Sequence, residues 1–129
     1  MQGTLLNMFG VTKKEYEMAD LNEKNKLNNL FNTILPINPR RKGVINDEKV
    51  INPDMSVNFS DYVLEEIDCP VLILHAKNDP MAKYEEMQTA SKRFKNVQII
   101  LYETGGHVLF GHDEETRRHI SNFILQNSN

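Results

Sequence analysis

Two short apolar runs, each followed by a polar loop, constrain the fold of this chain more than any other feature. Val71-Leu72-Ile73-Leu74 is continuously apolar, which is typical of a strand buried on both faces. Residues Val97 to Tyr102 form a second run, rich in β-branched side chains, and a stretch with helical spacing separates the two. This order predicts a parallel pair of strands joined by a right-handed crossover. The loops that follow the two strands are therefore expected at the same edge of the sheet.

Helices are predicted between the two strands and after the second one. Pro80 is suitably placed near the first turn of the crossover helix, and residues 113–125 carry acids at the start of a final helix. Ile120, Phe123 and Ile124 are expected to face inward from that final helix. The side chains that share one face of the crossover helix are Tyr84, Met87, Ala90 and Phe94.

The chain divides near residue 60, and residues 1–60 are expected to form a helical and loop-like segment resembling a cap or lid. Thr12 and Asp20 are each followed by Glu three residues later, which is a helix-start pattern. A helix is predicted over residues 21–35, ended by Pro36, and residues 36–60 are expected to be a long loop. The apolar face expected to pack into the core of that helix is Leu27, Leu30, Phe31 and Ile34.

Composition excludes several classes of partner. The net charge is only −3, so no strong basic field suggests a nucleic acid, and no apolar run has the roughly 18 residues of a membrane span. The N-terminus lacks the pattern of a signal peptide, and Cys69 is the single cysteine, so no internal disulfide or cysteine-rich zinc site is expected. The expectation is a cytoplasmic protein that needs no metal and no cofactor.

The loops after the two strands carry the residues that suggest chemistry. Asp79 lies in His75-Ala76-Lys77-Asn78-Asp79-Pro80, and His107 ends Gly105-Gly106-His107. Neighbouring strands would bring this carboxylate and this imidazole together, as the acid and base of a nucleophilic-catalysis site. Asp79 could instead be a simple turn residue before Pro80, because Asp-Pro pairs mark loops.

Across roughly residues 20–126 the chain resembles the α/β-hydrolase superfamily, specifically its C-terminal half with part of the cap. Leu64 to His75 resembles the lead-in to the strand that bears the catalytic acid, and Pro36 to Arg40 is similar to a cap motif of small bacterial members. Asn78-Asp79-Pro80 matches the acid, and Gly105 to His112 matches the histidine loop.

The resemblance implies an α/β fold in which residues 61–129 are the C-terminal portion of a doubly wound hydrolase sheet. That portion would hold two parallel strands, a crossover helix and a C-terminal helix, preceded by cap helices. Asp79 would be the catalytic acid and His107 the general base of a serine hydrolase of the carboxylesterase or lipase type. The substrate implied is a small apolar ester.

One part of the family pattern is missing. The G-x-S-x-G elbow that carries the nucleophile is absent, and Cys69 is expected at the wrong end of its strand to replace it. The chain is therefore expected to be a fragment or one product of a split gene, inactive by itself. The serines, none of which has the flanking glycines, are Ser56, Ser60, Ser91, Ser121 and Ser128.

Two strands bury too little apolar surface and leave both edges unpaired, which raises an alternative function. The chain could be a non-catalytic half-domain that pairs with itself, as a homo-oligomer, or with a complementing chain. A flavodoxin-like module is a weaker alternative, because no glycine-rich phosphate loop follows either strand. Arg40 and Arg41 are expected to be a solvated pair rather than to bind an acidic substrate, and Arg40 could equally pair with a carboxylate such as Asp47. His112 is expected to cap the final helix.

Overall fold

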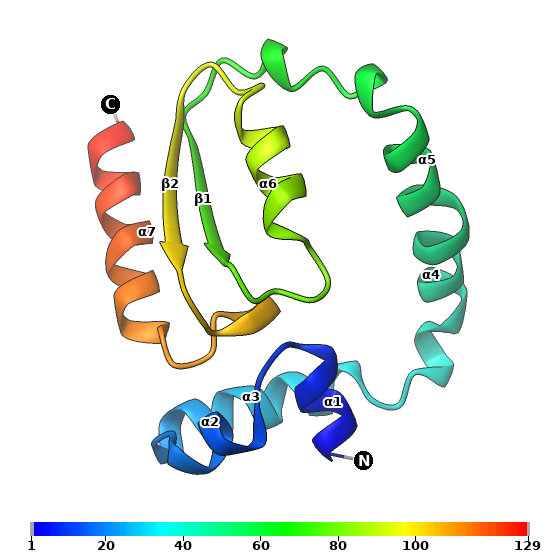
Figure 1. Cartoon of the computed structure of the whole chain (residues 1–129), viewed down its shortest axis with the longest axis vertical. Helices are drawn as coiled ribbons and strands as arrows, with labels where there is room; N and C mark the ends of the chain where they lie inside the picture. Colours follow the sequence, from blue (N-terminus) through cyan, green and yellow to red (C-terminus); the bar gives the residue numbers. More distant parts are fainter. Residues whose placement is uncertain (1, 129) are drawn as a thin grey trace.

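A computed structural model describes residues 2–128, and a two-stranded parallel sheet lies at its centre. β1 (Val71–Ala76) pairs with β2 (Val97–Tyr102) in continuous register, from Val71 opposite Val97 to Ala76 opposite Tyr102. α6 (Tyr84–Ser91) connects the strands, and α7 (Asp113–Asn127) follows β2 (Figure 1). The predicted partial α/β architecture, with two parallel strands, a crossover helix and a C-terminal helix, is confirmed.

One helix packs on each face of the sheet. The ring of His75 in β1 stacks on Tyr84 of α6, with 6.3 Å between the ring centroids. On the opposite face, the Tyr102 hydroxyl lies 3.1 Å from the Thr116 hydroxyl of α7, within hydrogen-bonding distance. Alternation of side chains along a strand explains why neighbouring positions contact different helices.

The sheet is less completely covered than the sequence predicts. Val71 to Leu74 are only half-buried, and Ile99 and Leu101 of β2 are 38% and 40% exposed. The expectation of a strand buried on both faces is therefore wrong, because two strands with one helix on each side do not enclose both surfaces. Ile120 and Ile124 of α7 are also exposed rather than inward-facing, for the same reason.

The crossover helix is shorter than predicted. α6 begins at Tyr84 after Lys83 and ends at Ser91, so Pro80 and Phe94 lie outside it. The turn that Asp79 makes with the backbone N–H groups of Met81 and Ala82 occupies the residues before the helix.

Three helices lie in the N-terminal part of the chain: α1 (Gln2–Met8), α2 (Lys13–Met18) and α3 (Leu21–Ile34). Thr12 forms the predicted capping box with Glu15, since each residue's backbone N–H donates to the other's side chain. Asp20 accepts from the Glu23 backbone N–H, and α3 ends just before Pro36. The predicted helix starts are confirmed.

The main buried cluster joins these N-terminal helices to the loop after β2. Leu27 and Phe31 bring the inner face of α3 to it, and Leu30 and Ile34 pack at its margin, as predicted. Figure 1 shows α1, α2 and α3 lying beneath the carboxyl-terminal edge of the sheet. The buried members are Leu6, Phe9, Val11, Leu27, Phe31 and Phe110.

Residues 36–60 are mostly helical, so the expected long loop is wrong. A 3₁₀ turn η1 (Asn38–Arg40) leads into α4 (Arg41–Asn46), the π-helical turn η2 (Asp47–Ile51) and α5 (Asn52–Val57). Pro53 is the second residue of α5, which directly follows the π-helical turn η2. We call residues 40–61 the helical arm; in Figure 1 it stands apart from the sheet.

Arg93, in the segment between α6 and β2, anchors the far end of the arm. Two 3₁₀ turns, η3 (Phe59–Asp61) and η4 (Leu64–Glu66), follow α5. The Arg93 guanidinium donates to the Glu65 carboxylate of η4 at 2.6 and 2.9 Å. It also donates to the carbonyls of Phe59 and Tyr62. The hydrogen bond from Arg93 lowers the pKa of Glu65 to about 2. The chain is thus fixed where it enters β1.

No helix in the described part of the chain combines the length and the apolarity needed to cross a lipid bilayer.

Candidate active site

The structure brings the two predicted site residues together at the carboxyl-terminal edge of the sheet. Asp79 lies in the loop after β1, and His107 lies in the 3₁₀ turn η5 (Gly106–Val108) after β2. The Nδ1 atom of His107 is 2.9 Å from Oδ2 of Asp79, which is a hydrogen-bonding distance. A carboxylate and an imidazole in this arrangement can act as a coupled acid–base pair.

Asp79 is fixed from three directions. Its side chain is only 5% exposed, and Oδ1 accepts hydrogen bonds from the backbone N–H groups of Met81 at 2.8 Å and Ala82 at 3.1 Å. Burial is the largest single influence and raises the pKa of Asp79, but the hydrogen bonds from Ala82, His107 and Met81 outweigh it. The net pKa lies below the ordinary value, so the carboxylate is ionised at neutral pH.

His107 presents the opposite edge of its ring to solvent. The side chain is 40% exposed, and no hydrogen bond among residues 2–128 involves Nε2. The ring also lies beside Phe9, with 6.2 Å between centroids. When Nδ1 carries the proton shared with Asp79, Nε2 is free to accept a proton from a reacting group.

The N-terminal segment holds the histidine loop in place. The His107 backbone N–H donates to the Phe9 carbonyl at 2.8 Å. Gly106 has φ of +58°, and a Cβ atom there would lie 1.9 Å from the same carbonyl oxygen. Only glycine combines this left-handed conformation with so close an approach of two backbones.

Asn78 connects three segments at this edge. Its Oδ1 accepts from the Gly106 backbone N–H at 2.9 Å, and its Nδ2 donates to the Gly10 carbonyl at 3.3 Å. The sequence marks Asn78 only as part of the acid motif, and it predicts no role for Phe9 or Gly10. No local signal marks them, because their contacts depend on residues far along the chain.

One protein family matches the part of the chain that contains the sheet and both site residues. The family model described as TAP-like protein matches residues 53–128, more than half of the chain. The chain belongs to the TAP-like α/β-hydrolases. No curated protein and no solved structure matches it.

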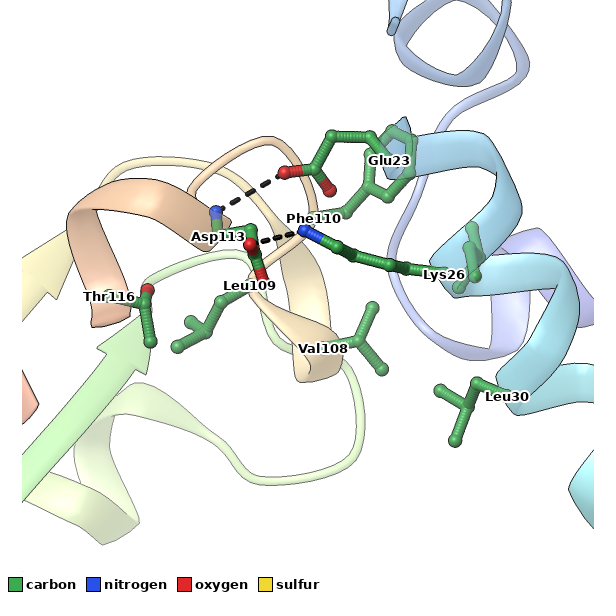
Figure 2. Close-up of a pocket in the computed structure, with 9 residues that line it drawn as sticks. Glu23, Lys26, Leu30, Val108, Leu109, Phe110, Asp113 and Thr116 are labelled. Carbon is green, nitrogen blue, oxygen red and sulfur yellow. Dashed lines mark hydrogen bonds and ion pairs between the residues drawn. The ribbon is translucent and has the colours of Figure 1, made fainter. Parts of the chain in front are cut away.

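Beside the histidine loop, this α/β-hydrolase chain has a pocket of about 160 Å³ (Figure 2). Leu27 and Leu30 of α3 line one side, and Val108 and Leu109, which directly follow His107, line the other. Lys26 forms an ion pair with Asp113 at its margin. The lining thus combines apolar side chains with charged groups at one side.

A glutamate, rather than His112, caps α7. The Glu23 carboxylate accepts from the backbone N–H groups of Gly111 and Asp113, each at 3.3 Å. His112 occupies the N-cap position without a capping hydrogen bond, and its ring stacks on Tyr102 at 4.3 Å instead. The predicted capping role of His112 is therefore wrong, because the ring packs against the end of β2.

The remaining candidates lie away from the Asp79–His107 pair. No hydrogen bond in the described part of the chain joins His107 to a serine or to Cys69. Ser91 is buried at the end of α6 and donates to the Gln88 carbonyl, and Cys69 is exposed before β1. Arg40 donates to the Pro36 carbonyl and forms no ion pair with Asp47 among the described residues. Within residues 2–128, no three metal-ligating side chains gather.

Proposed function

We propose that Asp79 and His107 are the catalytic acid and general base of an ester-hydrolysing site of the serine-hydrolase type. The hydrogen bond between Nδ1 and the buried, ionised Asp79 carboxylate carries this proposal. The carboxylate holds the tautomer in which Nε2 is unprotonated and stabilises the imidazolium that forms when Nε2 takes a proton. Nε2 then returns that proton to the leaving alcohol.

The pocket beside His107 supports a small apolar ester as the substrate. Its apolar wall would hold the hydrocarbon part of the substrate by burial of surface. Val108 and Leu109 follow His107 in the histidine loop, so the pocket and the general base share this loop, although neither His107 nor Asp79 lines the pocket.

The nucleophilic hydroxyl is proposed to come from outside residues 1–129. The serines of this chain lack the G-x-S-x-G context, and none is hydrogen-bonded to His107 in the described part. A general base without a nucleophile does not form an acyl-enzyme. We therefore expect residues 1–129 alone to show no serine-type turnover.

Hydrolysis of a p-nitrophenyl ester by the purified chain tests this proposal. We expect equal, near-background rates for the wild type, His107→Ala and the control His119→Ala, with no adduct to a fluorophosphonate probe by intact mass. Hydrolysis that is lost in His107→Ala but kept in His119→Ala would show that the chain supplies its own nucleophile.

Nuclear magnetic resonance tests the acid–base pair separately. The imidazole Nδ1–H of His107 should give a downfield proton resonance that shifts or disappears in Asp79→Asn and is unchanged in Glu115→Gln. A spectrum in which Asp79→Asn leaves that resonance in place would overturn the assignment of roles.

A second candidate function is a non-catalytic half-domain that pairs with another copy or with a complementing chain. The unpaired edges of β1 and β2 and the exposed Ile99 and Leu101 favour it. A partner whose binding leaves ester hydrolysis at background but protects both strands from hydrogen exchange would support this function over the enzymatic one.

A further inference from the structure

Leu109, two residues after His107, has a backbone conformation that leucine rarely adopts. Its φ is +53° and its ψ is +40°, in the left-handed region, and no other non-glycine residue among residues 2–128 has a positive φ. This region is unfavourable for a residue with a side chain, because Cβ then lies too close to the following carbonyl oxygen. A strained residue of this kind persists only where the surrounding structure holds it.

Backbone hydrogen bonds on both sides hold Leu109 in this conformation. Its N–H donates to the Gly106 carbonyl at 3.3 Å, and its carbonyl accepts from the His112 N–H at 3.0 Å. The Phe110 N–H donates to the Gly105 carbonyl at 2.8 Å across the same turn. The turn therefore specifies the left-handed conformation at this position.

A glycine would adopt the same conformation without this strain. The histidine loop already has glycine at its three other positions with positive φ, which are Gly105, Gly106 and Gly111. A leucine at the remaining position costs stability that only its side chain can offset. The role of Leu109 therefore lies in what this side chain contacts.

The Leu109 side chain forms part of the wall of the pocket of about 160 Å³ between the histidine loop and α3 (Figure 2). Val108 and Phe110, on either side of it in sequence, line the same pocket. Consecutive side chains of a helix or a strand point in different directions, so the left-handed turn at Leu109 helps to bring all three to one pocket. Leu27 and Leu30 of α3 complete the apolar surface.

The polar side chains of this lining already have partners within the chain. Lys26 forms an ion pair with Asp113. The Glu23 carboxylate accepts two backbone N–H groups around the start of α7, and the Thr116 hydroxyl is within hydrogen-bonding distance of the Tyr102 hydroxyl. The surface left for a ligand is therefore mainly apolar, which favours an uncharged group.

We propose that Leu109 is a specificity-determining residue, which limits the pocket to a group about the size of one benzene ring. A cavity of about 150 Å³ lined by aliphatic and aromatic side chains holds benzene, and this pocket has nearly the same volume. The inference rests on the proposed hydrolase function, under which the substrate is an uncharged ester with a short or single-ring hydrocarbon group. Leu109 selects by size, because the strained turn holds its side chain in the pocket.

Methyl NMR of the full chain tests this inference through binding, because no turnover is expected. Phenyl acetate and 2-naphthyl acetate carry the same acetyl ester on one ring and on two fused rings. We expect phenyl acetate to shift the methyl resonances of Leu27, Leu30 and Val108. Its Kd should be at least about tenfold lower than that of 2-naphthyl acetate, because two fused rings overfill the pocket.

Leu109→Ala removes the part of the wall that sets the size. We expect 2-naphthyl acetate to bind this variant at least about tenfold more tightly than it binds the wild type. Leu125→Ala is the control, at a side chain that is 76% exposed on α7, and it should leave both Kd values unchanged.

Leu109→Gly separates the backbone strain from the size of the side chain. It enlarges the pocket as Leu109→Ala does, so its preference between the two esters should change in the same way. Because glycine adopts a positive φ without strain, the glycine variant should unfold at a higher urea concentration than the alanine variant. If the alanine variant does not fold, the glycine variant carries the binding test.

Two results would overturn the inference. One is phenyl acetate that shifts none of these methyl resonances, and the other is a size preference that stays the same when Leu109 is shortened. The second result would make Leu109 a packing residue only. Size selection that is retained while the Nδ1–H resonance of His107 fails its test would support this inference and contradict the proposed acid–base pair alone.

Discussion

The backbone N–H of His107 donates a hydrogen bond to the carbonyl of Phe9 at 2.8 Å. This contact joins the start of the chain to the loop that carries the proposed general base. Asn78 reinforces it by bonding both Gly106 and Gly10. The geometry of the Asp79–His107 pair thus depends on a segment with no chemistry of its own.

Replacing Gly106 with alanine should destabilise the protein, because the added Cβ would lie 1.9 Å from the Phe9 carbonyl oxygen. Gly111 is a matched control, since its φ is also positive at +85° but a Cβ there meets nothing within 4 Å. We expect Gly106→Ala to lose about 1–3 kcal/mol more than Gly111→Ala in urea unfolding. Equal losses would mean that the close approach to Phe9 does not limit this position.

Replacing Asn78 with alanine should loosen the histidine loop. It removes the acceptor for Gly106 N–H and the donor to Gly10, at a cost of about 1–3 kcal/mol. Asn96→Ala, at an exposed turn position, is the control and should be nearly neutral. Heteronuclear NMR should also show broadened or shifted His107 ring resonances in Asn78→Ala; an unchanged ring would contradict the positioning role.

The lowered pKa of Asp79 predicts a specific pH dependence of stability. A carboxyl group with a lowered folded-state pKa contributes stability that is complete above its ordinary pKa, near 3.8, and lost as the pH falls through the folded value. Asp79→Asn should therefore cost about 1–3 kcal/mol at neutral pH, with a difference from the wild type that shrinks in acid. Unfolding free energies measured by denaturant titration between neutral pH and acid check this. A constant difference across that range would contradict it.

The ion pair between Lys26 and Asp113 ties α3 to the start of α7. The hydrogen bond from Lys26 is the largest influence on Asp113, and with help from Arg117 it lowers the pKa of that carboxyl. Because both side chains are about one-third exposed, we expect a coupling energy below about 1 kcal/mol in a Lys26→Met/Asp113→Asn double-mutant cycle. The more exposed pair of Lys77 and Glu103 should show a smaller coupling, and the opposite ranking would contradict the argument.

Much of the fold follows from local sequence. The apolar run of β1, the β-branched run of β2 and the capping residues Thr12 and Asp20 predict where elements begin, and the structure agrees. These features depend on propensities and hydrogen bonds within a few residues, so they are visible without tertiary contacts. The joint position of Asp79 and His107 follows from the order of the elements, because parallel strands end at the same edge.

The helical arm shows where local reasoning fails. Residues 41–57 have no sustained apolar periodicity, because no side of the arm faces a core in the described chain. Apolar periodicity in a sequence indicates which face of a helix is buried, so it cannot reveal a helix that has no buried face. The same logic explains Ile120 and Ile124, whose helical spacing predicts burial that this sheet is too narrow to provide.

The sequence by itself determined the two strands, the crossover order and the residue types at the proposed site. Only the tertiary structure decided that Phe9 and Gly10 support the His107 loop, that Glu23 caps α7, and that the arm stands uncovered. These last features arise from contacts between segments distant in sequence. Their free energy depends on which groups the folded chain brings together, and no local preference of either segment encodes it.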